Sequence, residues 1–220
     1  NSWTINSYTA TAHVNLDGSV AVEEYITYEF DDDFSGTLRK NIESFSASAV
    51  DDMSIYHVVD VDEEDIKKSK LEQIKSDSYE VLLDQEYGIV NGVDVPVDSG
   101  EGQRTLVYRY TLYDLVGIYK DMALLDWSFI NKEDSPCVGD MSITVHIPKD
   151  GDVQLTHSSL QGVLYSQQTK KDNTIYFEAS LMGDDELRLI LLLPNSMIPE
   201  GRKIIDNEIE ILKPYSPLDF

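Results

Sequence analysis

The chain has 220 residues, enough for one large β domain or two small ones, and 41% of them are hydrophobic, so a sizeable core is expected. Its 41 acidic and 17 basic residues give a formal net charge of −24. A surface this acidic repels phosphate backbones and anionic lipid head groups, which argues against nucleic-acid binding and against a basic membrane-binding patch. The favoured partners are cationic: a basic protein or peptide, an amine-bearing polymer or divalent metal ions. The competing interpretation is that the acidity only keeps the domain in solution.

The sequence contains neither a cysteine pair nor a membrane-spanning run. Cys137 is the single cysteine, which excludes an internal disulfide, and it is interpreted as structural because no histidine partner is evident. No apolar run approaches the ~20 residues of a transmembrane helix, and the longest is Leu189–Leu193. The chain begins at Asn1 without Met and ends at Phe220, so the absence of a targeting segment from it says little about the full-length protein.

The first thirty residues predict a long β-hairpin. Trp3–Val14 and Val20–Phe30 alternate between apolar and polar residues, and Asn15–Gly18 has the composition of a tight turn. Glu24 lies on the apolar face of the second strand. We expect this carboxylate either to lie near an edge or to pair with a cation.

The region between the hairpin and residue 104 predicts loops, two short strands and one helix. Acidic residues precede lysines in Asp62–Lys75, an order that suits a helix dipole and i,i+4 ion pairs, so a short inserted surface helix is expected there. The other expected elements are an exposed loop at Asp31–Asn41, a strand at Met53–Val59, a strand at Tyr79–Leu83 and a Gly- and Asp-rich loop at Glu86–Gln103.

Residues 104–130 hold the largest concentration of aromatic area and predict the centre of the core. One face of the strand Leu106–Tyr113 carries Tyr108 and Tyr110, and one face of the strand Leu125–Ile130 carries Trp127. Alternation with aromatic and β-branched enrichment is typical of sheet strands that are buried on one face.

The remainder of the chain predicts further short strands. They are Met141–Ile147, Val153–Thr156, Gly162–Tyr165, Thr174–Leu181 and Glu186–Leu193, the last apolar enough to be buried on both faces. Glu200–Leu212 is expected to be a short charged helix or tail. The fold class is therefore all-β and mainly antiparallel, sandwich-like, with one inserted helix. Residues 1–195 form one domain, or two lobes split near residue 100, and residues 196–220 form a juxtamembrane tail.

Catalytic motifs are missing from the sequence, and only a weak metal motif stands out. Asp31, Asp33 and Ser35, followed by Gly36, resemble the start of an EF-hand calcium loop, although position 12 is Ile42 and not glutamate. The four histidines are scattered, and none has a second histidine at metal-ligand spacing. We therefore expect no catalytic residue, no cofactor and no metal, with calcium at these three residues as the alternative.

The few basic residues predict structural ion pairs. Arg39 follows the Gly36 loop, Arg109 lies in the aromatic strand, and Asp121 and Asp126 flank the core. Because the chain has few basic residues, we expect these arginines to form ion pairs with carboxylates that stabilise the sheet rather than to bind a ligand.

The order of several motifs resembles one known family. The motifs are Asp17-Gly18-Ser19-Val20, Val22-Glu23-Glu24, Tyr28-x-Phe30, Gly36-Thr37-Leu38-Arg39-Lys40-x-Ile42, Tyr108-x-Tyr110, Gly117, Tyr119-x-Asp121-x-Ala123-x-Leu125-x-Trp127-x-Phe129-Ile130, Ile143-x-Val145-x-Ile147-Pro148 and Leu187–Pro194. Over residues 3–195 this set is similar to the N-terminal extracytoplasmic region of predicted bacterial membrane proteins known as domain of unknown function 2207. The Asp60–Lys75 insert and the Glu200–Phe220 tail depart from that pattern.

The resemblance implies topology more than chemistry. Such proteins have a signal sequence or first anchor, this outer domain and then transmembrane helices, and they have no established activity to carry over. We expect a non-enzymatic recognition or structural module on the extracytoplasmic face of the bacterial cell membrane, attached through flanking segments, with a protein or the cell wall as partner. The alternatives are a calcium-dependent adhesion or scaffold domain and a hydrolase that uses a carboxylate pair on cell-wall glycan. A deep pocket lined by Tyr108, Tyr110 or Trp127 would favour a small-ligand receptor, and a shallow patch would favour a protein partner.

Overall fold

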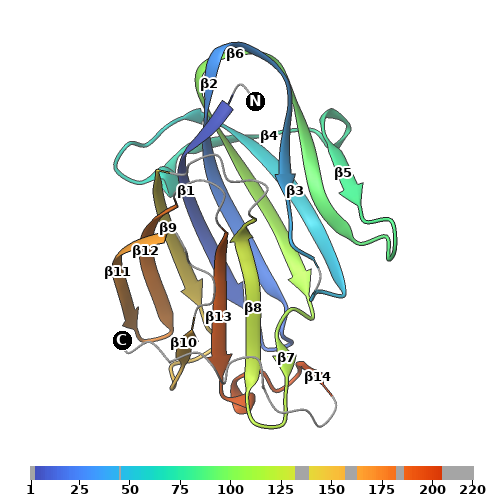
Figure 1. Ribbon diagram of the computed structural model, residues 1–220, viewed down its shortest axis with the longest axis vertical. Helices are drawn as coiled ribbons and strands as arrows, with labels where there is room; N and C mark the ends of the chain where they lie inside the picture. The colour runs from blue at the N-terminus through green and yellow to red at the C-terminus, as the bar shows by residue number, and fades with distance from the viewer. Residues whose placement is uncertain (1–2, 45, 132–138, 157–162, 182–185, 205–220) are drawn as a thin grey trace.

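Two β-sheets pack face to face in the computed structural model, which describes residues 3–44, 46–131, 139–156, 163–181 and 186–204 (Figure 1). The larger sheet has nine strands and the smaller has five, and all but two of the strand pairings are antiparallel. The all-β, mainly antiparallel and sandwich-like fold expected from the sequence is confirmed.

The strand order interleaves the two halves of the chain. The large sheet runs β11 (Val163–Lys171), β12 (Thr174–Leu181), β9 (Asp140–His146), β1 (Trp3–Val14), β2 (Val20–Asn41), β6 (Val90–Tyr113), β3 (Ala49–Asp60) and β4 (Lys70–Gln73), with β5 (Glu80–Leu83) also paired to β6. The small sheet runs β10 (Gln154–Thr156), β13 (Leu187–Leu193), β8 (Ala123–Ile130), β7 (Gly117–Ile118) and β14 (Arg202–Lys203). Because β6 runs through residue 100 and β9 pairs with β1, both halves of the chain contribute to one sheet.

The N-terminal hairpin is confirmed, with Val14 paired to Val20 at its closed end. Gly18 has a φ of +81°, the left-handed conformation that the turn requires. Asp17 Oδ1 accepts from the hydroxyl and the backbone N–H of Ser19 at 2.6 and 2.8 Å. These two bonds stabilise the charged form and lower the pKa of Asp17, so the turn is fixed by its own side chains.

The core lies between the inner faces of the two sheets, where Figure 1 shows β8 and β13 crossing in front of β1 and β2. On β6 the alternating set Leu106, Tyr108, Tyr110 and Leu112 is buried, and on β8 so are Leu125, Trp127 and Phe129. The sequence therefore identified the core strands correctly. β13 is buried along nearly its whole length, and on its other face Ile190 and Leu192 form a second small cluster with Leu124 of β8, against which Tyr119 and Met122 pack.

Two segments expected to be exposed loops are strands instead. Asp31–Asn41 is the second half of β2, and most of Glu86–Gln103 is the first half of β6. The two segments pair with each other, and together they form a ribbon that arches over at the top of the molecule (Figure 1). On one side of β6, the pairing with β5 ends at Asp94 and the pairing with β3 begins at Leu106. Pro96 lies in the gap between these two partner strands, where its missing N–H costs no ladder hydrogen bond on that side.

The expected helix at Asp62–Lys75 was wrong. That segment is a single 3₁₀ turn, Ile66–Lys68, followed by β4. Asp62 Oδ1 accepts from the backbone N–H groups of Glu64 and Asp65, and Asp65 caps the turn by accepting from Lys67 N–H. Such local bonds compete with a helix, and i,i+4 ion pairs of about 0.3–0.5 kcal/mol do not outweigh them together with the pairing of β4 to β3.

The C-terminal prediction is only partly within the described residues. Residues 200–204 form a turn and the two-residue strand β14, and the rest of the expected helix or tail, like Cys137, lies outside the described part of the chain. Within the described residues, no helix has the length and apolar character needed to cross a membrane.

Candidate functional site

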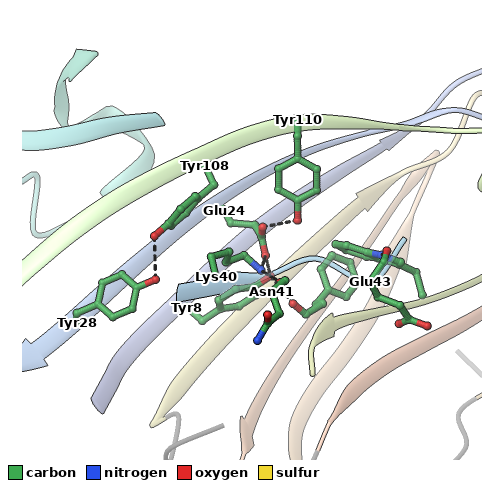
Figure 2. A network of polar contacts seen from close by, with 10 residues as sticks. Tyr8, Glu24, Tyr28, Lys40, Asn41, Glu43, Tyr108 and Tyr110 are labelled. Carbon is green, nitrogen blue, oxygen red and sulfur yellow. Dashed lines mark hydrogen bonds and ion pairs between the residues drawn. The ribbon is translucent and has the colours of Figure 1, made fainter. Parts of the chain in front are cut away.

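A buried polar network lies between the sheets, around Glu24 of β2 (Figure 2). Its carboxylate is fully buried and accepts hydrogen bonds from the hydroxyls of Tyr8 and Tyr110. Lys40 Nζ lies 3.3 Å from Glu24 Oε2 and donates to the carbonyl of Asn41 at 3.1 Å. The arch of β2 returns Lys40 to the core, so one strand supplies both charges of this pair.

The network explains the glutamate on an apolar face. The expectation that Glu24 pairs with a cation is confirmed, and the cation is Lys40. Burial, followed by the charge of Glu24, raises the pKa of Tyr8 well above its usual value, so this phenol stays protonated and keeps donating. Three strands of the nine-stranded sheet, β1, β2 and β6, thus supply the groups that satisfy the buried charge of Glu24.

Further polar pairs extend from this centre. The hydroxyls of Tyr28 and Tyr108 are 3.0 Å apart (Figure 2), and Trp127 Nε1 donates to the carbonyl of Glu43 at 2.8 Å. Tyr108, Tyr110 and Trp127 are therefore buried structural residues. A cavity of only about 10 Å³ adjoins Tyr8, Tyr28 and Lys40, which is about the size of one water molecule. Tyr108, Tyr110 and Trp127 do not line this cavity.

Two carboxylates do converge on one residue, as the hydrolase alternative requires. Ser128 donates its backbone N–H to Glu43 at 2.9 Å and its hydroxyl to Glu186 at 3.0 Å. Ser128 is 3% exposed, and neither glutamate lines the cavities described here. Both glutamates are only partly buried, and their bonds to Ser128 connect them to β8 of the small sheet.

The expected structural ion pairs are present. Arg39 binds Asp94 through two nitrogens, at 2.5 and 2.7 Å, and Arg109 Nε donates to Glu23 at 2.6 Å. The Arg109 guanidinium also lies 4.6 Å from the ring centre of Tyr56. Asp126 makes the corresponding pair with Arg188, at 2.6 and 2.7 Å, whereas Asp121 accepts from the backbone N–H of Met122.

The calcium candidates lie on a strand and not in a loop. Asp31 and Ser35 are exposed residues of β2, the side chain of Asp33 lies outside the described set, and Gly36 pairs with Val97. The extended backbone does not form the turn on which the EF-hand comparison depended. Among the described residues, no group of three His, Cys, Asp or Glu side chains is placed to hold a metal ion.

The accessible site is a cleft of about 770 Å³ on the outer face of the nine-stranded sheet. Strands β1, β2, β3 and β6 form its floor, and the connector between β3 and β4 forms one wall. Its lining residues are Asn6, Ser7, Thr9, Tyr25, Thr27, His57, Val58, Val61, Asp62, Glu63, Ile66, Gln103, Arg104 and Thr105. Sequence reasoning missed this cleft, because its lining residues come from four strands and a connector that are far apart in the sequence.

A second cavity of about 300 Å³ continues the cleft toward β9 and β12. Ser7 and Thr9 line both cavities, so the two hollows meet over β1. The second cavity adds Asp140 of β9 and Glu178 of β12. The outer face thus carries one trough that crosses several strands.

Hydroxyl groups line the centre of the trough and charges lie toward its ends. Thr27 and Thr105 are joined at 2.8 Å through their hydroxyls, and Thr9 accepts from Ser142 at 3.3 Å. Partial burial and the neighbouring Arg104 lower the pKa of His57, so this imidazole is neutral at neutral pH. Four carboxylates, Asp62, Glu63, Asp140 and Glu178, face a single arginine among the lining residues.

Several solved structures align with the chain at low sequence identity. A structure of native yeast LTA4 hydrolase aligns with a TM-score of 0.52 at 9% identity over 87% of this chain and 29% of that one. A putative protease from Parabacteroides distasonis has a TM-score of 0.49 at 10% identity, over 87% and 40% of the two chains. An M1 zinc metallopeptidase from Deinococcus radiodurans has a TM-score of 0.42 at 10% identity, over 87% and 42%. The chain spans less than half the length of each, and the likeness to the yeast protein concerns the fold alone.

Sequence comparison supplies the family. No curated protein matches the chain. The family model described as "Predicted membrane protein (DUF2207) N-terminal domain" matches residues 4–187, which is most of the chain. Glu24, Lys40 and Tyr110, which lie within that match, meet in the buried network. The chain therefore belongs to the DUF2207 family and is the N-terminal domain of a predicted membrane protein.

Proposed function

We propose that this domain recognises a partner and does not catalyse a reaction, and that its binding surface is the trough on the outer face of the nine-stranded sheet. The observation that carries the proposal is the size of the main cleft, about 770 Å³, which lies within the range of ligand sites. Membership of a family of predicted membrane proteins supports attachment through flanking segments. The side of the membrane that we propose for the domain is the extracytoplasmic face of a bacterial cell.

The partner that fits this trough is an extended basic segment of a polypeptide. Adjacent strands lie about 4.8 Å apart, so a trough that crosses β6, β2, β1, β9 and β12 accommodates an extended chain better than a compact molecule. Ser and Thr hydroxyls in its centre both donate and accept, as peptide groups require. The excess of carboxylates over arginine among the lining residues favours lysine and arginine side chains on the partner.

The proposal of a non-catalytic role is supported by how the buried groups are used. The buried carboxylate with the densest set of partners, Glu24, is paired with Lys40 and two tyrosines. Glu43 and Glu186 are both bonded to the buried Ser128. These bonds engage all three carboxylates within the protein, which supports a structural role for them.

A steric variant tests the trough directly. Thr9→Trp fills the point where the two cavities meet, and Thr111→Trp places the same bulk on the outward face of β6 outside both cavities. Binding of fluorescein-labelled hexalysine, with hexaglutamate as the negative control, is measured by fluorescence anisotropy at physiological salt. Thr9→Trp is expected to raise the dissociation constant about tenfold or more, a loss of ~1.4 kcal/mol, while Thr111→Trp leaves it unchanged. No hexalysine binding, or equal effects of the two variants, would overturn the proposal.

A further inference from the structure

Two histidines far apart in the sequence stack on each other on the outer face. His13 of β1 and His146 of β9 are direct partners in the parallel pairing of these strands. Their ring centroids are 4.4 Å apart and the rings are inclined by only 15°. Neither residue lines the trough, so this arrangement is independent of the proposed function.

One ring is already oriented by a neighbour. His146 Nδ1 lies 3.1 Å from Thr174 Oγ1 on β12, which leaves Nε2 of the same ring for another partner. A hydrogen bond at one imidazole nitrogen that fixes the ring is the usual support of a metal-binding histidine. Burial, and then the adjacent His13 and Lys67, lower the pKa of His146, which favours the neutral imidazole that binds metal.

We propose that His13 and His146 form a two-histidine site for a transition-metal ion such as Zn²⁺, with water completing the coordination. Zinc binds imidazole nitrogen at about 2.0–2.1 Å, so a tetrahedral ion brings two such nitrogens to about 3.4 Å from each other. The stacked rings do not point at a common ion, because a metal lies in the plane of each imidazole that binds it, so the exposed His13 has to turn out of the stack to bring its nitrogen to that distance from His146 Nε2. The hard ions Mg²⁺ and Ca²⁺ prefer oxygen ligands and do not fit this pair.

The surroundings bear on the strength of the site. Lys67 is the cation near His146, but it is exposed, so its flexible side chain can turn away. The net charge of −24 attracts cations to the surface as a whole. Within the described residues no third His, Cys, Asp or Glu joins the pair, so the site binds more weakly than three- or four-ligand zinc sites.

Calorimetric titration with Zn²⁺ tests the site, with Mg²⁺ at matched ionic strength as the control ion. The wild-type chain is expected to bind one Zn²⁺ that is lost in His13→Ala and in His146→Ala. Thr174→Val, which removes only the orienting hydroxyl, is expected to weaken binding about tenfold or more. His57→Ala removes a histidine of β3, a strand that pairs with neither β1 nor β9, and is expected to leave binding unchanged.

The outcomes against the proposal are equally definite. Zinc binding that persists in the His13→Ala/His146→Ala double variant would mean that surface carboxylates hold the ion, and the site would be rejected. An equal loss in His57→Ala, or no binding by the wild type, would also reject it. Both histidines are on the outer face, and circular dichroism of each variant verifies that the fold is retained.

Discussion

The Glu24 carboxylate, which is fully buried, lies 3.3 Å from Lys40 Nζ, although the two residues are separated by the whole arch of β2. Removing one partner of a buried ion pair leaves the other charge uncompensated, at a cost of about 3–5 kcal/mol. Lys40→Met is therefore expected to lower the free energy of unfolding by about that amount, measured by urea denaturation.

The neighbouring ion pair provides the control for this effect. Arg39 is 54% exposed in its pair with Asp94, so Arg39→Met is expected to cost only about 0–1 kcal/mol. The double variant Glu24→Leu/Lys40→Met is expected to be more stable than the sum of its single variants indicates, because no charge stays unpaired. Similar losses in Lys40→Met and Arg39→Met would show that Lys40 is not held as a buried charge.

A glycine pair tests the turn of the first hairpin. A Cβ at Gly18 would lie 2.8 Å from the carbonyl oxygen of Val116, whereas a Cβ at Gly88 would meet no atom within 4 Å. Both residues have positive φ, +81° and +67°, so alanine costs about 1–2 kcal/mol of backbone strain at each. Gly18→Ala is expected to lose about 1–3 kcal/mol more than Gly88→Ala from the clash. Equal losses in urea denaturation would mean that the chain relaxes around Val116.

Two histidines predict a pH dependence of stability. The pKa values of His57 and His146 are lowered, mainly by burial, so the folded protein binds their protons less readily than the unfolded chain does. Their contribution to the free energy of unfolding is fully present above the pKa of the unfolded chain, about 6.5, and is lost as the pH falls through the lower pKa values of the folded protein. The free energy of unfolding should therefore decrease from about pH 7.5 to about pH 5, and His57→Gln/His146→Gln should flatten this decrease. An unchanged slope in the double variant would assign the effect to other groups.

Calcium binding at Asp31, Asp33 and Ser35, the alternative to our expectation of no metal, can be tested by thermal unfolding. Millimolar Ca²⁺ and Mg²⁺ at matched ionic strength are expected to shift the melting temperature equally, because both ions screen the net charge of −24. A shift specific to Ca²⁺ that disappears in Asp31→Asn/Asp33→Asn would instead establish a calcium site.

The success and failure of the sequence predictions have a common physical origin. The period-two pattern identified the core strands, because a half-buried strand repeats its environment every second residue, as Tyr108 and Tyr110 do. The same pattern identified Glu24 as a charged residue on an apolar face, but the neighbouring sequence did not indicate which cation would pair with it. Lys40 reaches Glu24 only because the segments expected to be loops pair with each other.

The candidate sites were hidden for a similar reason. His13 and His146 become neighbours through the parallel pairing of β1 with β9, a contact that has no local signature. The trough is formed by outward-facing residues such as Ser7, Thr9 and Thr105. These have the composition of any solvent-facing strand, and only the placement of the β3–β4 connector over them creates a cleft.

The pairing of β1 with β9 also constrains how the chain reaches its native state. The first strand has one neighbour within its own hairpin, but its other side stays open until the segment up to His146 has been synthesised. Such distant pairing requires a large loop closure before it contributes stability, which slows folding and leaves a strand edge exposed to other chains. A fragment that stops before Asp140 would therefore retain an unprotected β1 edge, and we expect it to aggregate during synthesis where the complete domain does not.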